Sequence, residues 1–481
     1  MNDEQQDILL QNWTQRQELA ELMLPIIGRL YRNHGIALRI YGRPINNVTT
    51  VDIIKTHRFA RQYTGKELPI QVSFTLAQAM ESLNLAPARV DLGRLTNKYL
   101  QEGGGLVPAD FLRRELADIV DRPEPVLKEP RDIVLYGFGR IGRLIARLLI
   151  ERTGSGNKMR LRGFVVRKGK DNDLQKRAAL LRRDSVHGPF DGSITIDDEN
   201  SAIIANGNFI KVINAEGPDK IDYTSYGIRN AIVIDNTGLW RDEAGLSLHL
   251  KSPGVSRVLL TAPGKGTLKN IVFGVNSDSI TDDDRILTAA SCTTNAIVPV
   301  LKVVNDHFGI VHGHVETVHS YTNDQNLIDN YHKGERRGRS APLNMVITET
   351  GAAKAAAKAL PELAGKLTGN AIRVPTPNVS LAILNLTLER PTTKDEINAF
   401  LRDCALSPEM QEQIDYIASS EIVSSDLVGS RHAGVVDSKA TIASERNVVL
   451  YVWYDNEFGY SCQVVRIAQQ MAGIQLATFP A

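Results

Sequence analysis

Residues 136–143 read Tyr-Gly-Phe-Gly-Arg-Ile-Gly-Arg and follow the apolar run Asp132–Tyr136. That run predicts a short buried strand, and the spacing of the residues from about Gly139 to Glu151 predicts a helix. Glycines at 137, 139 and 142 permit a tight turn and a close approach of the backbone to a pyrophosphate at the helix N-terminus. Because the glycines lie between a strand and a helix, the pattern predicts dinucleotide binding.

Strands and helices continue to alternate after this loop. Further strand-like runs are Leu161–Val166, Ala231–Asp235, Val258–Thr261 and Ile271–Val275. The alternation predicts an α/β domain with a parallel, doubly wound sheet. We place this Rossmann-type dinucleotide-binding domain over residues 131–291, completed by a C-terminal helix segment at about 461–481, with the helix itself at about 461–471.

The pattern changes after Cys292. Helices are expected near Thr294–His307, Ala352–Leu360 and Thr393–Leu401, and strands near Val311–His319, Ala371–Val374, Ser380–Leu388 and Asn447–Tyr454. Mixed elements of this kind predict an α+β domain with an antiparallel sheet. We expect this catalytic domain to span residues 292–460.

Residues 1–130 are expected to form a mainly helical N-terminal extension that ends in a linker. Apolar residues recur at helical spacing over Asp7–Tyr31, Thr75–Leu83 and Ala109–Ile119, with a break at Gly103–Gly105. The linker, residues 121–130, has three prolines and should be extended. The extension is either a module that packs on the core or extends an oligomer, or a regulatory or partner-binding module. Its sequence identifies no ligand.

Composition narrows the functional classes. A chain of 481 residues suggests about three domains, and a net charge of +1 gives no support for a dedicated nucleic-acid binder. The apolar run Val448–Tyr454 is far too short to span a bilayer. The first 30 residues lack the basic start and apolar block of a secretory signal, so we expect a cytoplasmic protein. Three widely spaced cysteines suggest no disulfide framework, and we expect no metal site, His312 and His314 included.

Residues 290–296 read Ala-Ser-Cys-Thr-Thr-Asn-Ala, and His319 follows Cys292 by 27 positions. A cysteine at a helix N-terminus gains a dipole that favours the thiolate, and a histidine lowers the thiol pKa by forming an ion pair. Together with a dinucleotide loop, the pair indicates thiol addition to an aldehyde followed by hydride transfer. Cys404 and Cys462 lack such surroundings and are expected to pack in the core.

These segments together resemble one family, the phosphorylating glyceraldehyde-3-phosphate dehydrogenases. The resemblance runs from about Arg131 to the C-terminus, roughly 70% of the chain. It rests on residues 136–143 and 291–295, on Asp184-Ser-Val-His-Gly188, His319-Ser-Tyr-Thr-Asn-Asp324, Arg336-Arg-Gly-Arg339, Thr350-Gly-Ala-Ala-Lys354, Arg373-Val-Pro-Thr376 and Trp453-Tyr-Asp-Asn-Glu457. All of these motifs stand in the family's order.

The resemblance implies a reaction and a site. The enzyme would oxidise D-glyceraldehyde 3-phosphate with inorganic phosphate and NAD(P) to 1,3-bisphosphoglycerate, or run the reverse in gluconeogenesis, as a homotetramer without membrane partners. Cys292 would be the nucleophile and His319 the base. The implied cofactor-binding residues are Gly137, Gly139, Arg140, Ile141, Gly142, Thr237, Gly238, Thr261 and Asn456. Thr322 and Arg373 match positions for the substrate phosphate, and Ser291, Thr293, Arg337, Thr350 and Gly351 those around the attacking phosphate.

Two alternatives remain open at this stage. An erythrose-4-phosphate dehydrogenase is a relative that resolves the thioester with water. A regulatory binding protein on an inactive dehydrogenase fold is the other, with residues 1–130 as its working part.

The choice between NAD and NADP also remains open. The second strand ends in Val166-Arg-Lys-Gly-Lys170, where an acidic residue normally bonds the adenosine ribose of NAD. Arg167 and Lys168 would favour a 2′-phosphate, which makes NADP use plausible. Asp171 or Asp173 would reach the ribose only through a longer loop.

Overall fold

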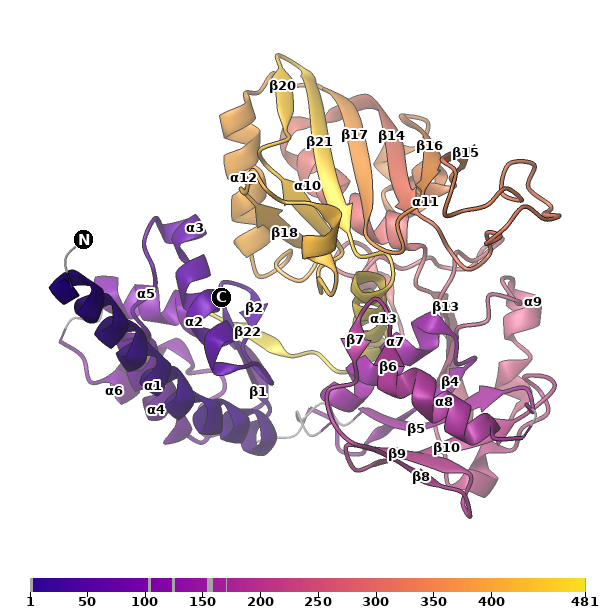
Figure 1. Cartoon of the computed structure of the whole chain (residues 1–481), viewed down its shortest axis with the longest axis horizontal. Helices are drawn as coiled ribbons and strands as arrows, with labels where there is room; N and C mark the ends of the chain where they lie inside the picture. Colours follow the sequence, from indigo (N-terminus) through magenta and orange to yellow (C-terminus); the bar gives the residue numbers. More distant parts are fainter. Residues whose placement is uncertain (1–2, 103–104, 123–125, 154–158, 170, 481) are drawn as a thin grey trace. The chain divides into compact units, whose positions relative to one another are not determined.

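The computed structural model describes residues 3–102, 105–122, 126–153, 159–169 and 171–480 (Figure 1). The chain forms two compact units. One contains the described residues among 1–130, 152–158 and 473–481, and the other contains residues 131–151 and 159–472. Part of the predicted linker and of the glycine break lies outside the described residues. No helix in the described ranges is both long and apolar enough to cross a bilayer.

The first unit is a helical layer on a small sheet. Its helices are α1 (Asp3–His34), α2 (Thr50–Phe59), α3 (Arg61–Thr64), α4 (Ile70–Glu81), α5 (Leu92–Glu102) and α6 (Pro108–Glu115). Its sheet has the order β2 (Arg43–Pro44), β1 (Ile36–Ile40), β3 (Ala88–Asp91) and β22 (Ala477–Phe479). The predicted helices are present, but none of these strands was predicted.

Strand β22 comes from the opposite end of the chain. It lies parallel to β3, with Phe479 opposite Val90 and Ala477 opposite Ala88. Val90 and Ala88 are fully buried, and Phe479 is nearly so, so the C-terminal residues contribute to the core of this unit. Sequence analysis placed residues 473–481 with the dinucleotide domain, whereas the structure groups them with the N-terminal unit.

The dinucleotide domain opens the second unit and confirms the Rossmann-type prediction. Its sheet has the order β13 (Ile286–Thr288), β12 (Val255–Leu260), β11 (Ala231–Asp235), β4 (Arg131–Tyr136), β5 (Met159–Val166), β10 (Asn208–Asn214), β9 (Ala202–Ala205) and β8 (Ile194–Asp197). Strands β13 to β10 in this order are parallel, and β9 and β8 add an antiparallel hairpin. Other elements are α7 (Arg140–Glu151), α8 (Asp173–Arg182), α9 (Glu243–Leu246), β6 (Arg183–Asp184) and β7 (Gly188–Pro189).

One predicted strand is wrong. Residues Ile271–Val275 are buried in part but form a turn instead of a strand. The Asn276 side chain directs this turn, because its oxygen accepts the Val272 amide at 2.8 Å and its nitrogen donates to the Asn270 carbonyl at 3.0 Å. The run keeps a backbone bond to β13, from the Ile271 amide to the Thr288 carbonyl at 2.7 Å. The Asn276 side chain bonds the backbone on either side of Ile271, so the run reaches the core without forming a strand.

The catalytic domain contains a second large sheet. Its order is β15 (Val346–Glu349), β16 (Leu367–Val374), β14 (Ile310–Ser320), β17 (Ser380–Leu388), β21 (Asn447–Tyr454), β19 (Gly434–Asp437) and β18 (Ile414–Ile417), and β20 (Ile442–Ser444) pairs with β21. The helices are α10 (Cys292–Phe308), α11 (Ala352–Ala359) and α12 (Lys394–Leu406). The sheet is mainly antiparallel as predicted, but β14 runs parallel to β16 and β18 parallel to β19.

Helix α13 (Phe458–Met471) joins the two halves of the second unit. It packs on α7 of the dinucleotide domain and on α10 of the catalytic domain. Nearly every residue of α13 is buried, polar ones such as Gln463 and Ser461 included, which is what a helix enclosed on all sides requires. The helix ends at Met471, so the segment 461–481 that we assigned to the dinucleotide domain is helical up to that residue, where the predicted helix ends.

Candidate active site

Cys292 begins helix α10, and the backbone around it is shaped for that position. The Ser291 hydroxyl caps the helix by accepting the Thr294 amide at 3.1 Å. Ala290 has a φ of 52°, a left-handed conformation that alanine rarely adopts, and its carbonyl accepts the Tyr460 hydroxyl at 3.1 Å. This sharp turn puts Cys292 at the positive end of the helix dipole.

His319 lies near the end of β14 and faces the cysteine. Its Nε2 is 3.5 Å from the Cys292 Sγ, and its Nδ1 is 2.7 Å from the Ser320 carbonyl oxygen. A proton on Nδ1 satisfies that carbonyl and leaves the lone pair of Nε2 facing the thiol. Arg373 Nη1 donates to the same carbonyl at 3.0 Å and lies 2.9 Å from Nδ1, so the two nitrogens share this acceptor.

Burial acts on both titrating groups. It raises the pKa of the Cys292 thiol, although Arg373 and hydrogen bonds from Thr293 act in the opposite direction. Burial and then the positive charge of Arg373 lower the pKa of His319 to about 3. Both shifts act against the ion pair expected from the sequence, while the N-terminus of α10 favours the thiolate.

One cavity of about 300 Å³ surrounds this pair. Nine of the predicted site residues line it: Arg140, Ile141, Thr261, Ser291, Cys292, His319, Thr322, Arg373 and Asn456. They come from the N-terminus of α7, the end of β12, α10, β14, β16 and the turn before α13. The fold therefore gathers residues that are more than 300 positions apart in the chain around one thiol.

A second cavity, of about 280 Å³, lies over the glycine loop and includes Gly137, Gly139, Arg167 and Thr237. Gly142 and Gly139 are required for different steric reasons. At Gly142 a Cβ would lie 2.5 Å from the Gly137 carbonyl oxygen, so helix α7 can pack on the loop only without a side chain. At Gly139 a Cβ would meet nothing within 4 Å. That open space is where a diphosphate could approach the backbone, so the loop fits a dinucleotide.

Comparison with known proteins agrees with this geometry. The NAD binding domain of glyceraldehyde 3-phosphate dehydrogenase matches residues 131–243, and the C-terminal domain of the same enzyme matches residues 291–456. A glyceraldehyde-3-phosphate dehydrogenase of Zymomonas mobilis is 40% identical over 342 residues, which cover 71% of this chain and 98% of that protein.

The chain belongs to the glyceraldehyde-3-phosphate dehydrogenase family. Glyceraldehyde-3-phosphate dehydrogenase 1 of Bacillus subtilis is similar to it at 39% identity over 340 residues, 70% of this chain and 97% of that protein. A glyceraldehyde-3-phosphate dehydrogenase-like protein of Pseudomonas aeruginosa is 63% identical over 460 residues, 95% of this chain and all of that protein. A match of that length includes much of residues 1–130, so this relative shares the N-terminal unit.

Within this family framework, Asn456 is held in one orientation. Its side-chain oxygen accepts the Ser380 hydroxyl at 2.9 Å, and the Ser380 oxygen accepts the Ser320 amide at 3.1 Å. Because the oxygen is engaged, the NH₂ group of Asn456 remains as the donor toward the cavity. A donor at this position fits the carbonyl of a nicotinamide carboxamide.

The Arg140 side chain has a structural partner that the sequence reasoning missed. It forms a close ion pair with Glu457 and also lies 3.3 Å from Asp184. This pairing links the glycine loop to the turn that carries Asn456. The motif Asp184–Gly188 had no assigned role. In the structure Asp184 accepts the amides of Val186 and His187, both at 2.9 Å, and so shapes this link.

Cationic groups surround the far side of the thiol. Arg373 Nη1 donates to the Thr322 hydroxyl at 3.3 Å, Thr322 bonds closely to Asp324, and Asp324 pairs with Arg337 at 3.0 Å. Among the described residues, the buried Nε atoms of Arg373 and Arg337 have no hydrogen-bond partner. Unsatisfied buried guanidinium donors of this kind suit an anionic ligand.

The thiol cavity, as the described residues define it, does not include the predicted residues Arg337, Thr293, Thr350, Gly351 and Gly238. The Thr293 hydroxyl is buried and bonds the Tyr454 hydroxyl at 2.9 Å. Thr350 accepts the Ala352 amide at the start of α11, and Gly351 has open space beside its Cα. Gly238, with a φ of 63°, borders a separate cavity described below.

The basic cluster after β5 is only partly as predicted. Arg167 lines the glycine-loop cavity, Lys168 is exposed elsewhere, and Lys170 lies outside the described residues. Arg177 lines the same cavity and was missed, although its spacing from Asp173 suggests the helical pair seen at 2.7 Å. Asp173 is thus engaged with Arg177, and neither Asp171 nor Asp173 lines the cavity.

The remaining observations are an acidic residue at the glycine-loop cavity and the surroundings of His314, which was considered as a metal ligand. Glu216, which sequence reasoning also missed, is an exposed carboxylate at the glycine-loop cavity. His314 bonds the Thr368 hydroxyl at 2.8 Å. Over the described ranges, no three His, Cys, Asp or Glu side chains gather as a metal site would need.

Proposed function

We propose that the protein catalyses the reversible, phosphate-dependent oxidation of D-glyceraldehyde 3-phosphate to 1,3-bisphosphoglycerate. The observation that carries the proposal is the cavity in which Cys292, His319, Asn456 and Arg373 meet beside the glycine-loop helix. Family membership and the NAD binding domain support an oxidoreductase of this type.

In this proposal Cys292 forms the covalent intermediate. Its sulfur adds to the aldehyde carbon while His319 Nε2 takes the thiol proton and returns it to the aldehyde oxygen, giving a hemithioacetal. His319 then takes the hydroxyl proton as the carbon loses a hydride. A bound nicotinamide supplies the hydride acceptor. The carbon has lost two electrons and is now a thioester to Cys292.

Inorganic phosphate completes the cycle. A phosphate oxygen attacks the thioester carbon, the carbon–sulfur bond breaks, and the cysteine leaves as a thiolate that is reprotonated. The net reaction releases one proton to solvent. The Cys292 backbone amide, at the start of α10, and His319 stabilise the charge on the carbonyl oxygen during both additions.

The pKa shifts of Cys292 and His319 support a role for His319 as the base that takes the thiol proton. Because burial raises the thiol pKa and lowers that of the imidazole, we propose that proton transfer to His319 accompanies attack on the aldehyde. The negative charge that develops on the substrate oxygen then stabilises the imidazolium. Arg373 cannot accept a proton at neutral pH, so its contribution is to hold His319 and to bind an anion.

Substrate orientation follows from the placement of charge. Thr322 and Arg373 are proposed to bind the phosphate carried by the aldehyde, and Arg337 assists through Asp324. Asn456 is proposed to hold the carboxamide so that one nicotinamide face meets the hemithioacetal carbon. Ser291 caps α10 and so fixes the position from which the Cys292 sulfur attacks the aldehyde carbon.

The decisive experiment is steady-state kinetics with inorganic phosphate as the variable. Formation of reduced cofactor from glyceraldehyde 3-phosphate should require phosphate and saturate with it. Turnover of erythrose 4-phosphate at equal rate without phosphate would instead favour the water-resolving alternative. No turnover of either aldehyde would favour the regulatory binding protein.

Cofactor choice is proposed to include NADP. Arg167 and Arg177 border the glycine-loop cavity and provide two cations for a 2′-phosphate, while Glu216 is the acidic group there. The remaining proposals are that the enzyme is a cytoplasmic homotetramer and that residues 1–130 act outside the catalytic machinery. Kinetics with both cofactors test the cofactor choice, and sedimentation of the full chain tests the tetramer. Turnover by a chain that starts near Pro130 tests the role of residues 1–130.

A further inference from the structure

A third cavity, of about 330 Å³, lies between the dinucleotide-binding half of the second unit and the loop after β14, apart from the thiol cavity. Gly238, Leu239, Trp240, Arg241, Asp242, Lys265 and Lys333 line it. The proposed reaction uses none of its charged residues. Arg241 follows β11, Lys265 follows β12, and Lys333 belongs to the long loop after β14, so three separate segments each contribute one cation.

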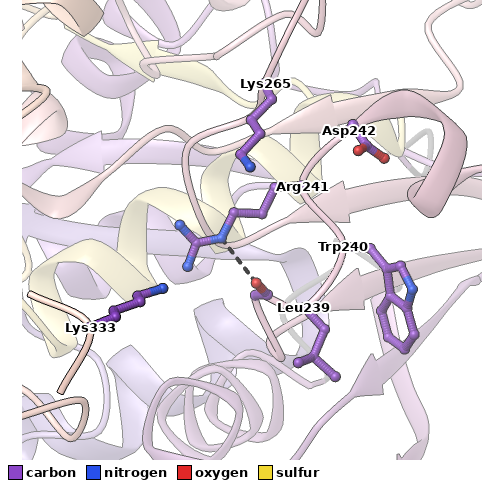
Figure 2. Close-up of a pocket in the computed structure, with 7 residues that line it drawn as sticks. Leu239, Trp240, Arg241, Asp242, Lys265 and Lys333 are labelled. Carbon is purple, nitrogen blue, oxygen red and sulfur yellow. Dashed lines mark hydrogen bonds between the residues drawn. The ribbon is translucent and has the colours of Figure 1, made fainter. Parts of the chain in front are cut away.

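Figure 2 shows how these groups are arranged. The ammonium groups of Lys265 and Lys333 point toward the Arg241 guanidinium from different sides, while the Asp242 carboxylate lies away from them, nearer Trp240. The backbone fixes Arg241: its Nε donates to the Gly238 carbonyl at 2.9 Å, and its carbonyl accepts the Lys265 amide at 2.7 Å. In the part of the chain that the structure describes, the outer guanidinium nitrogens and both ammonium groups have no hydrogen-bond partner and can donate to a ligand.

The carboxylates nearby do not neutralise this cluster. Within the described residues, none lies within 4.0 Å of the charged nitrogens of Arg241, Lys265 or Lys333. Asp242 is the one acidic residue lining the cavity, and its Oδ1 accepts the Gly245 amide as the cap of α9. Three like charges gathered without a counter-charge repel one another, and a bound anion removes that cost.

We propose that this cavity binds a small polyanion, a molecule that carries at least two phosphate groups. The volume is that of a small-ligand site instead of a flat surface for a protein partner. The arginine offers a fork to one phosphate, and the two lysines supply point charges for a second. Trp240 and Leu239 form an apolar wall that this cavity shares with the glycine-loop cavity.

Occupancy would connect two parts of the enzyme. Lys333 lies on the loop that also carries Thr322, Asp324 and Arg337, whereas Arg241 and Lys265 belong to the dinucleotide domain. An anion held between them restrains the loop against that domain. Binding of the polyanion would therefore affect Thr322 and Arg337, which lie on the same loop and take part in the proposed binding of the substrate phosphate.

Calorimetric titration with inorganic tripolyphosphate tests the proposal. The full-length protein is first saturated with NAD, so that the dinucleotide cavity is filled. The wild type should bind one equivalent per chain, and K265Q/K333Q should bind at least about tenfold more weakly, since each charge-assisted contact contributes strongly. The matched control K269Q removes an exposed lysine that pairs with Asp284 and should bind within about twofold of wild type.

Further measurements keep the result interpretable. K265Q/K333Q should keep wild-type turnover of glyceraldehyde 3-phosphate without tripolyphosphate, which shows that it is folded. Tripolyphosphate should slow hydrogen exchange in residues 326–345 of the wild type alone. The proposal is overturned if K265Q/K333Q binds as tightly as wild type, if R373Q and not K265Q/K333Q abolishes binding, or if the wild type binds no tripolyphosphate.

Discussion

Replacing Gly139 with alanine should weaken dinucleotide binding while leaving the fold intact. Gly139 is exposed, its φ lies outside the left-handed region, and a Cβ built on it meets no atom within 4 Å. The added methyl group therefore costs the protein little by itself. It does occupy the space through which a diphosphate must approach the backbone amides at the start of α7.

The magnitude follows from the contacts that would be displaced. One or two amide–phosphate hydrogen bonds, each contributing about 1.5–3 kcal/mol, would be lengthened or lost. The dissociation constant for NAD should therefore rise about tenfold to a hundredfold. Gly142→Ala is the matched control, because its Cβ would lie 2.5 Å from a backbone oxygen and must displace the loop. That overpacking should cost about 1–3 kcal/mol of stability.

Two assays separate these effects: calorimetric titration with NAD and thermal unfolding. Gly139→Ala should unfold within about 2 °C of wild type, whereas Gly142→Ala should unfold several degrees lower. The reasoning is refuted if Gly139→Ala binds NAD as wild type does, since the open space would then not be the diphosphate site. It is equally refuted if Gly139→Ala is the less stable of the two variants.

Other changes probe the rest of the molecule. Iodoacetamide should label Cys292 before the other cysteines, because Cys292 lines a cavity and has His319 Nε2 at 3.5 Å to take its proton. Cys462 is fully buried, and burial and then Asp403 raise the pKa of Cys404 to about 11, so earlier labelling of either would contradict the assignment. His319→Asn should lower kcat about 10²- to 10⁴-fold with little change in NAD affinity, and an unchanged kcat would exclude the proton-transfer role. Arg177→Gln should weaken NADP about tenfold more than NAD, with Lys168→Gln as the exposed control, and equal losses for both cofactors would argue against a 2′-phosphate site. Burial alone would raise the pKa of Asp184, but the amides of His187 and Val186 and then Arg140 lower it to about 2. The ionised carboxylate therefore stabilises the fold above about pH 4, and this contribution is lost as the pH falls toward 2. Asp184→Asn should cost about 1–2 kcal/mol of stability at pH 7 and should reduce the fall of Tm between about pH 4 and pH 2.

Much of the catalytic unit could be predicted because its signals are local. Helix α10 begins at Cys292, two residues before its predicted start at Thr294, and strands β14, β17 and β21 lie within a few residues of their predicted bounds. The conformation of a long run with regular apolar spacing and a capping side chain can be predicted without knowledge of distant residues. The family motifs then indicated which of these elements carry chemistry.

The N-terminal unit shows where local signals are insufficient. Strands β1 and β3 have only a few residues each, lie between stronger helical patterns, and become recognisable only when paired. Their third partner, β22, is almost 400 positions away from β3 in the sequence. A short strand is stabilised by its neighbours' hydrogen bonds and by burial, and neither is visible in a local window.

By itself the sequence determined the family and the dinucleotide-binding domain, and it predicted Cys292 and His319 as the catalytic pair. These rest on residue types at close spacing, where steric freedom and helix capping act over a few positions. Only the tertiary structure decided that Arg177 and Glu216 border the cofactor loop, that Arg140 pairs with Glu457, and that Lys265 and Lys333 approach Arg241. These relations join side chains on separate loops, and charges interact through space according to distance, which the order of residues along the chain does not contain.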